Sequence, residues 1–155
     1  MRTALFFIAS AVACVAAEPR AVNMSTQLDL ANSPAIAGFV VAGDKPVRVL
    51  VRVGGPSLKR FGISGVVEDP TFDVLGEGAV GAVHDNWESG GQELTETMAS
   101  AGAFSFLPGA KDAAGVFIVQ PGAITIAVRA NPVEGRDRGR VIVELYVLPD
   151  ESPAP

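Results

Sequence analysis

Several short segments of this chain place hydrophobic residues at every second position. Between residues 47 and 53, valine occupies positions 47, 49, 51 and 53, with Arg48, Leu50 and Arg52 between them. A period of two with β-branched residues is typical of a strand that buries one face. The same pattern recurs at residues 123–130 and at 141–147, where Glu144 and Tyr146 lie opposite the aliphatic positions. We therefore expect the strands at 47–53 and 141–147 to be central in their sheet.

The remaining segments predict further short strands and one helix. Residues 37–42 form an apolar run separated from 47–53 by Gly43-Asp44-Lys45-Pro46, which predicts a hairpin. Further strands are expected at 70–75, 79–83 and 116–120. One helix is expected to be capped by Ser89, with Gln92 completing a capping box. Leu94, Met98 and Ala101 share its apolar face, and Gly102 ends it.

These elements predict the fold class. About eight short strands with polar turns and one short helix indicate an all-β, antiparallel β-sandwich of the jelly-roll or Ig-like kind. The alternation of strands and helices that marks a parallel sheet is missing from the pattern. We expect one domain at residues 18–148 and a disordered tail at 149–155, which reads Pro-Asp-Glu-Ser-Pro-Ala-Pro.

The first seventeen residues have the layout of a secretory signal peptide. Arg2 precedes a run from Ala4 to Ala13 that is apolar except for Ser10, and Val15-Ala16-Ala17 supplies small residues for cleavage before Glu18. The run is too short to span a bilayer. The chain is therefore expected to be secreted or periplasmic, without a transmembrane segment. Two alternatives stay open, which are a buried helix of a cytoplasmic protein and a lipoprotein signal acylated at Cys14.

Charge and cysteine content exclude several classes of function. The formal net charge is −5, and losing Arg2 makes it more negative. An acidic domain argues against nucleic-acid binding, which depends on neutralising phosphates. Cys14 is the only cysteine and lies in the predicted signal. The expected mature chain therefore excludes a disulfide framework, a thiolate metal site and a cysteine nucleophile.

The densest group of chemically capable residues is His84-Asp85-Asn86-Trp87. His84 is the only histidine, and a neighbouring carboxylate suggests a general base. Adjacent residues of a strand point to opposite faces, however, and no serine is visibly placed as a nucleophile. The favoured interpretation is a strand end in which Trp87 closes the core. Two further hypotheses are a ligand site on these four residues and a calcium site using Asp85 and Asn86. We expect no catalytic residue, resident metal or other cofactor.

A second group, from Gly54 to Lys59, could be mistaken for a phosphate cradle. It lacks the Gly-Lys-Ser/Thr ending of a P-loop, so a tight turn is the better interpretation. Arg48, Arg52 and Arg129 lie opposite the aliphatic faces of their strands. Paired with Glu144 or Asp73, they would form cross-strand ion pairs. A sugar- or anion-binding sheet face is the alternative.

The order of several segments resembles a known family. Ile36-Ala37-Gly38-Phe39-Val40-Val41 comes first, then Val49 to Leu58 with its Gly-Pro-Ser-Leu ending, Phe61 to Gly65, Asp69-Pro70-Thr71, Asp85-Asn86-Trp87, Pro121-Gly122-Ala123 and Val143 to Tyr146. This resembles a repeat-like β-sandwich domain of secreted bacterial proteins of verrucomicrobial type, and is distantly similar to pre-peptidase C-terminal domains. His84, Ile124 and the charged segment 131–139 depart from the family pattern.

The resemblance implies an extracellular accessory module and supplies no catalytic residues. Our first expectation is a non-enzymatic adhesion or structural module whose partner is a cell-surface protein or a polysaccharide. The second is a carbohydrate-binding module that uses Trp87 and Tyr146, and it requires these aromatic rings to be exposed. The third is a small hydrolase based on His84 and Asp85, and it requires a hydroxyl within hydrogen-bond reach of His84.

Overall fold

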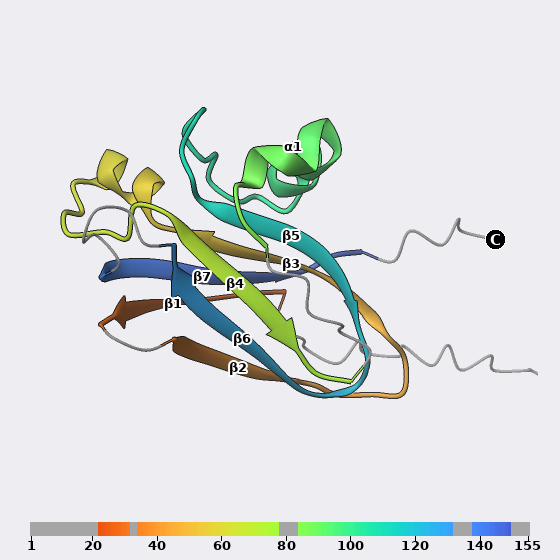
Figure 1. The fold of residues 1–155 in the computed structure, drawn as a ribbon. Coiled ribbons are helices and arrows are strands. Elements are labelled where there is room, and N and C mark those ends of the chain that lie inside the picture. The colour runs from red at the N-terminus through yellow and green to blue at the C-terminus, as the bar shows by residue number, and fades with distance from the viewer. Residues whose placement is uncertain (1–21, 32–33, 78–83, 132–137, 150–155) are drawn as a thin grey trace, which may run out of the picture.

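Two antiparallel sheets pack face to face in the computed structural model, which describes residues 22–31, 34–77, 84–131 and 138–149 (Figure 1). The described elements are β1 (Asn23–Leu30), β2 (Ala35–Val41), β3 (Val47–Gly54), the 3-10 helix η1 (Pro56–Phe61), β4 (Pro70–Leu75), the 3-10 helix η2 (Trp87–Gly90), α1 (Gly91–Ser100), β5 (Ala113–Val119), β6 (Gly122–Ala130) and β7 (Gly139–Val147). The expected all-β sandwich with one short α-helix is confirmed.

The larger sheet has four strands in the order β1-β7-β3-β5. Strands β3 and β7 are therefore central, as the alternation of their residues predicted. Their register places Val51 opposite Leu145 and Arg52 opposite Glu144. The smaller sheet has three strands in the order β2-β6-β4, and an isolated bridge from Phe72 to His84 lies beside β4.

The main core fills the space between the sheets. From β3 it takes the alternate residues Val49, Val51 and Val53, all completely buried, and from the facing sheet residues such as Phe72 and Ile126. Close packing of these residues excludes water from the space between the two sheets and stabilises the sandwich.

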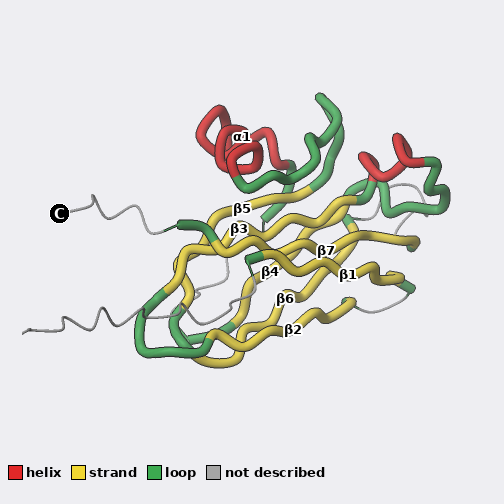
Figure 2. Tube along the Cα trace, turned by 180° about the vertical axis from the view of Figure 1, so that it is seen from behind, coloured by secondary structure: helices red, strands yellow, loops and turns green. Residues whose placement is uncertain are grey.

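A second core lies on the outer face of the larger sheet. Helix α1 and the segment after it cover β3 and β5 (Figures 1 and 2). Leu94 and Met98 of α1 pack with Leu50 and Tyr146 of the sheet, and Trp87 belongs to the same cluster. The helix face expected from its periodicity is therefore a packing face. Strand β3 buries both of its faces, where the sequence pattern predicted only one.

Two local predictions need correction, and a third is confirmed. Segments 37–42 and 47–53 do not form a hairpin, because β2 pairs with β6 and β3 pairs with β5 and β7. Ser89 does not cap α1, since Gly90 holds that position without a side-chain hydrogen bond and Ser89 lies in η2. Gly102 does follow the helix in the left-handed conformation, with φ of 74°.

Strand β1 was missed because its residues are mostly polar and exposed. The expected strand at 79–83, the signal at 1–17 and most of the tail at 149–155 lie outside the described residues. Within the described residues, no helix has the length and apolar character needed to cross a membrane.

Candidate functional site

His84 is held by aromatic packing. Its backbone N–H donates to the Phe72 carbonyl at 2.8 Å and its carbonyl accepts from the Phe72 N–H at 3.0 Å. Its ring stacks on Phe72 with centroids 5.4 Å apart and meets Phe117 edge-on at 4.6 Å. Burial lowers the pKa of this imidazole, while the charge of Asp73 opposes the shift. No described side chain hydrogen-bonds to the ring, so no carboxylate among the described residues is in hydrogen-bond contact with His84.

Asp85 belongs to a separate polar group. One carboxylate oxygen accepts from the Asn86 N–H at 2.7 Å, and the other accepts from Asn131 Nδ2 at 3.1 Å. The same Asn131 amide nitrogen lies 3.3 Å from Asp69, which is also paired with Lys111 at 2.6 Å. Asp85 therefore ties the segment after His84 to the end of β6. The expectation that His84 and Asp85 diverge agrees with these separate contacts.

Asn86 and Trp87 complete the turn that leads into α1. Asn86 has φ of 25°, which asparagine tolerates better than most residues. Trp87 is 9% exposed, and its indole N–H donates to the Ala110 carbonyl at 3.1 Å. Its backbone N–H donates to the Asp112 carbonyl at 2.8 Å. Trp87 therefore anchors the covering segment to the sheet, as the strand-end interpretation expected.

The Gly-Pro-Ser-Leu segment binds a carboxylate of the protein itself. The N–H groups of Gly55 and Ser57 donate to Asp112 Oδ1 at 2.7 and 3.2 Å, and Ser57 Oγ donates to Oδ2 at 2.5 Å. Ser57 Oγ also accepts from the Leu107 N–H at 2.8 Å. Ser57 and Asp112 are fully buried. The donors that a phosphate would need are therefore occupied, which agrees with a turn rather than a phosphate cradle.

The geometry of the same turn explains why glycine occupies position 55 and proline occupies position 56. A Cβ at Gly55 would lie 2.3 Å from the Val67 carbonyl oxygen, which is closer than any real contact. Pro56 begins η1, where its missing N–H costs nothing. This segment is consequently shaped by packing against the neighbouring backbone and by the internal Asp112 carboxylate.

A buried ion pair lies on the outer face of the larger sheet. Arg52 Nη1 is 2.9 Å from Glu144 Oε2, and Tyr146 donates its hydroxyl to Glu144 Oε1 at 3.0 Å. The Arg52 guanidinium also donates to the Phe104 carbonyl at 2.6 Å and lies over the rings of Phe104 and Phe106, 4.5 and 4.0 Å from their centroids. The expected pair of Arg52 with Glu144 is present. It is a cross-strand pair, as expected, and both of its side chains are buried.

The charges of this group influence one another. Burial lowers the pKa of Arg52, and the neighbouring Glu144 carboxylate opposes that shift. Burial and Glu144 together raise the pKa of Tyr146. Arg52 Nε has no hydrogen-bond partner among the described residues. The group thus keeps a neutral phenol and an ion pair beneath the aromatic cluster. Arg129 and Asp73 form the other expected pair, at the surface.

Two cavities lie at the surface of the sandwich. The first, about 310 Å³, lies between α1 and β5. Its lining includes His84 and the polar residues Ser89, Glu93 and Thr97. His84 of the predicted group thus lines a cavity large enough for a small molecule. No hydrogen bond joins His84 to Ser89 or Thr97 in the described structure.

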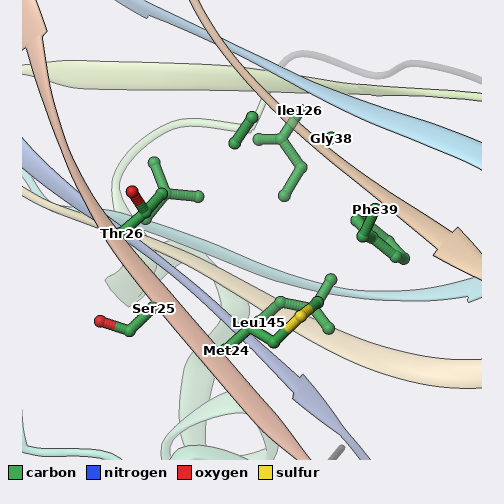
Figure 3. Close-up of a pocket in the computed structure, with 9 residues that line it drawn as sticks. Met24, Ser25, Thr26, Gly38, Phe39, Ile126 and Leu145 are labelled. Carbon is green, nitrogen blue, oxygen red and sulfur yellow. The ribbon is translucent and has the colours of Figure 1, made fainter.

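The second cavity, about 410 Å³, opens between β1 and β2 at the edge of the sandwich. Figure 3 shows Phe39 and Ile126 of the smaller sheet on one side and Met24 and Leu145 of the larger sheet on the other. The cavity is mostly apolar, and it contains none of the residues that the sequence singled out for chemistry. Among the described residues, no group of three or more His, Cys, Asp or Glu side chains is arranged to hold a metal ion.

Sequence reasoning missed Asp112, which accepts the hydrogen bonds of the Gly-Pro-Ser-Leu turn. Asp112 lies 57 positions from Gly55, and nothing in its local sequence marks it as a partner of that turn. The aromatic cover of Arg52 by Phe104 and Phe106 was also missed, because these residues lie outside any periodic segment. Comparison with protein-family models, with curated proteins and with solved structures found no match to this chain.

Proposed function

We propose that this chain is an exported, non-enzymatic β-sandwich module with a structural or adhesive role. The observation that carries the proposal is the use of its chemically capable side chains in packing. Trp87 and Tyr146 are 9% and 5% exposed, and both contribute to the second core. Ser57 and Asp112 satisfy each other in the interior. Burial of these groups favours a rigid scaffold over a reactive site.

The exported part of the proposal rests on the signal pattern of residues 1–17. The resemblance to repeat-like domains of secreted bacterial proteins supports the same assignment. A cell-surface protein or a polysaccharide is the partner class that such a module would contact.

The carbohydrate-binding alternative requires an aromatic surface on which sugar rings can stack. Because Trp87 and Tyr146 are covered, that alternative loses the two rings on which it was based. The hydrolase alternative retains one supporting observation, since His84 and Ser89 line the same cavity. The hydrolase alternative therefore determines which residues the experiment substitutes, namely His84 and Ser89.

Protein exported by its own host is assayed for hydrolysis of ester, peptide and glycoside substrates. We predict no turnover above background, because the described structure shows no base bonded to a nucleophile. N-terminal sequencing of the same preparation is expected to begin near Glu18. His84→Ala and Ser89→Ala variants are assayed alongside.

The outcome that contradicts the proposal is turnover that both substitutions abolish while circular dichroism shows folded protein. Turnover unaffected by either substitution would point to a contaminant, and a Thr97→Ala variant provides the control for a harmless change in the same cavity. Retention of Met1 in exported protein would contradict the signal assignment.

A further inference from the structure

Strand β2 is an open edge of the smaller sheet. It pairs with β6 on one side, and no described strand pairs with its other side (Figures 1 and 2). Such an edge presents unpaired N–H and C=O groups to any strand that approaches. Proteins usually protect exposed edges with charged residues, proline or bulges. From Ala35 to Val41, β2 contains no charged residue and no proline.

The other sheet edges differ from β2. Strand β1 carries mostly polar residues and Asp29, which approaches Arg140 at 4.0 Å. The outer side of β4 is partly occupied, since Phe72 exchanges two backbone hydrogen bonds with His84. On β2, by contrast, Ile36 and Val40 are 58% and 75% exposed. Strand β5, the other edge of the larger sheet, has the same residue composition as β2, but four of its seven residues are buried and Ile118 is its one exposed residue. No residue of β2 is buried, so β2 is the more exposed of the two uncharged edges among the described strands.

The sequence of β2 is complementary to itself. In an antiparallel pair centred on Gly38, Ile36 faces Val40 of the second copy and Ala37 faces its Phe39. Each alanine then meets a larger residue, Gly38 meets Gly38, and two β-branched residues meet on the solvent side. Such cross-strand pairs stabilise antiparallel sheets. No other centre within the strand leaves all seven residues paired.

The cavity between β1 and β2 supports the same arrangement. Ala37 and Phe39 line it from the β2 side, so it lies beside this edge (Figure 3). A second β2 strand added there would place its own Ala37 and Phe39 on the same face of the extended sheet, because residues alternate between the two faces of a strand. The added strand would consequently cover apolar surface that the single chain exposes.

Electrostatic repulsion opposes a second copy least at an uncharged edge such as β2. Two copies of a chain with a formal net charge of −5 repel each other. The repulsion is least where the contact itself brings no carboxylates together, and β2 meets that condition. A pair related by a two-fold axis is also closed, so it does not propagate into fibres.

We infer that this protein forms a symmetric dimer in which the β2 strands of two copies pair antiparallel about Gly38. The two three-stranded sheets then become one six-stranded sheet across the dimer. The inference goes beyond the proposed function and does not depend on it, since an enzyme could form the same dimer.

The test is sedimentation velocity on the full chain and on two double variants that differ only in the sign of the charge at position 40. Ile36→Lys with Val40→Lys places lysine opposite lysine at two symmetric positions, which is expected to weaken the dimer about tenfold or more. Ile36→Lys with Val40→Glu places lysine opposite glutamate at the same positions and is expected to restore it. The Lys/Lys variant has a less negative net charge, so long-range repulsion would act in the opposite direction. Leu75→Lys, at a 46% exposed position of β4, is the control for a single added charge.

A disulfide provides an independent test of register. In a Cys14→Ser background, Gly38→Cys is expected to form a disulfide-linked dimer, since facing residues of antiparallel strands have Cα atoms about 4.5–5.5 Å apart. A side chain fits at position 38, where a Cβ would lie 3.7 Å from the Ile124 carbonyl oxygen. Val40→Cys is the matched control, because its two copies would be separated by roughly 13 Å along the strands.

The expected results are a native dimer in the micromolar range, loss in the Lys/Lys variant, recovery in the Lys/Glu variant and cross-linking only at position 38. A native protein that stays monomeric overturns the inference. Equal association of the two charge variants, or cross-linking at position 40 instead of 38, overturns the pairing. Because the hydrolysis assay is separate, either proposal can fail alone.

Discussion

At the scale of single residues, polar side chains in this protein stabilise the interior by satisfying one another. Asp112 accepts three hydrogen bonds from Gly55 and Ser57, and Glu144 accepts from Arg52 and Tyr146. Burial raises the pKa of Asp112, while the hydrogen bonds from Ser57 and Gly55 oppose that shift. Buried polar groups tolerate little change, because removing one partner leaves the other desolvated and unpaired.

The Arg52 group yields a prediction about paired charges. Arg52→Met is expected to lower the free energy of unfolding by about 3–5 kcal/mol, because Glu144 stays buried without its cation. Replacing Arg52, Glu144 and Tyr146 together by Met, Leu and Phe is expected to recover most of that loss. Urea denaturation measures both variants. A single variant within about 0.5 kcal/mol of the native protein would show that the pair is not enclosed in solution.

At the scale of elements, the central strands determine the sandwich. Strand β3 lies between β5 and β7 and buries both faces, one against the smaller sheet and the other beneath α1 and the segment after it. Polar or charged substitutions on the aliphatic face of β3 are consequently expected to destabilise the fold strongly.

Val51 provides the test of that element. Val51→Asp is expected to cost more than about 4 kcal/mol, since Val51 is completely buried and the new carboxylate has no cation within the aliphatic core. Thermal denaturation followed by circular dichroism measures the effect. Ile118→Asp is the control, because Ile118 is 61% exposed and faces Arg48 in the register. An unchanged melting temperature in Val51→Asp would show that this face is not core.

Elements with strict alternation could be predicted from the sequence, and others could not. The strands at 47–53 and 141–147 were predicted to be central because β-branched residues repeat every second position. Strand β1 has no such signal, since its stability comes from pairing with β7. The hairpin prediction for 37–42 and 47–53 was wrong because a short loop can also carry the chain from one sheet to the other. Local residues do not distinguish these two paths.

At the scale of the whole molecule, the two sheets of the sandwich differ in what covers them. The larger sheet carries α1 and the aromatic segment, whereas the apolar edge at β2 is open among the described strands (Figure 1). The covered face holds Trp87, the residue of the His84–Trp87 group that sequence patterns placed correctly in the core. The partners of that group, such as Asn131 and Asp112, come from distant parts of the chain and had no local signal.

The central claim is that the residues which resemble a functional site hold the covering segment on the sheet. Equilibrium unfolding of Trp87→Ala tests it most directly. Trp87 packs edge-on against Phe106 at 6.0 Å and donates to the Ala110 carbonyl, so its removal is expected to cost about 3–5 kcal/mol. A variant as stable as the native protein that has selectively lost binding to a polysaccharide would contradict the account and assign Trp87 to a ligand site.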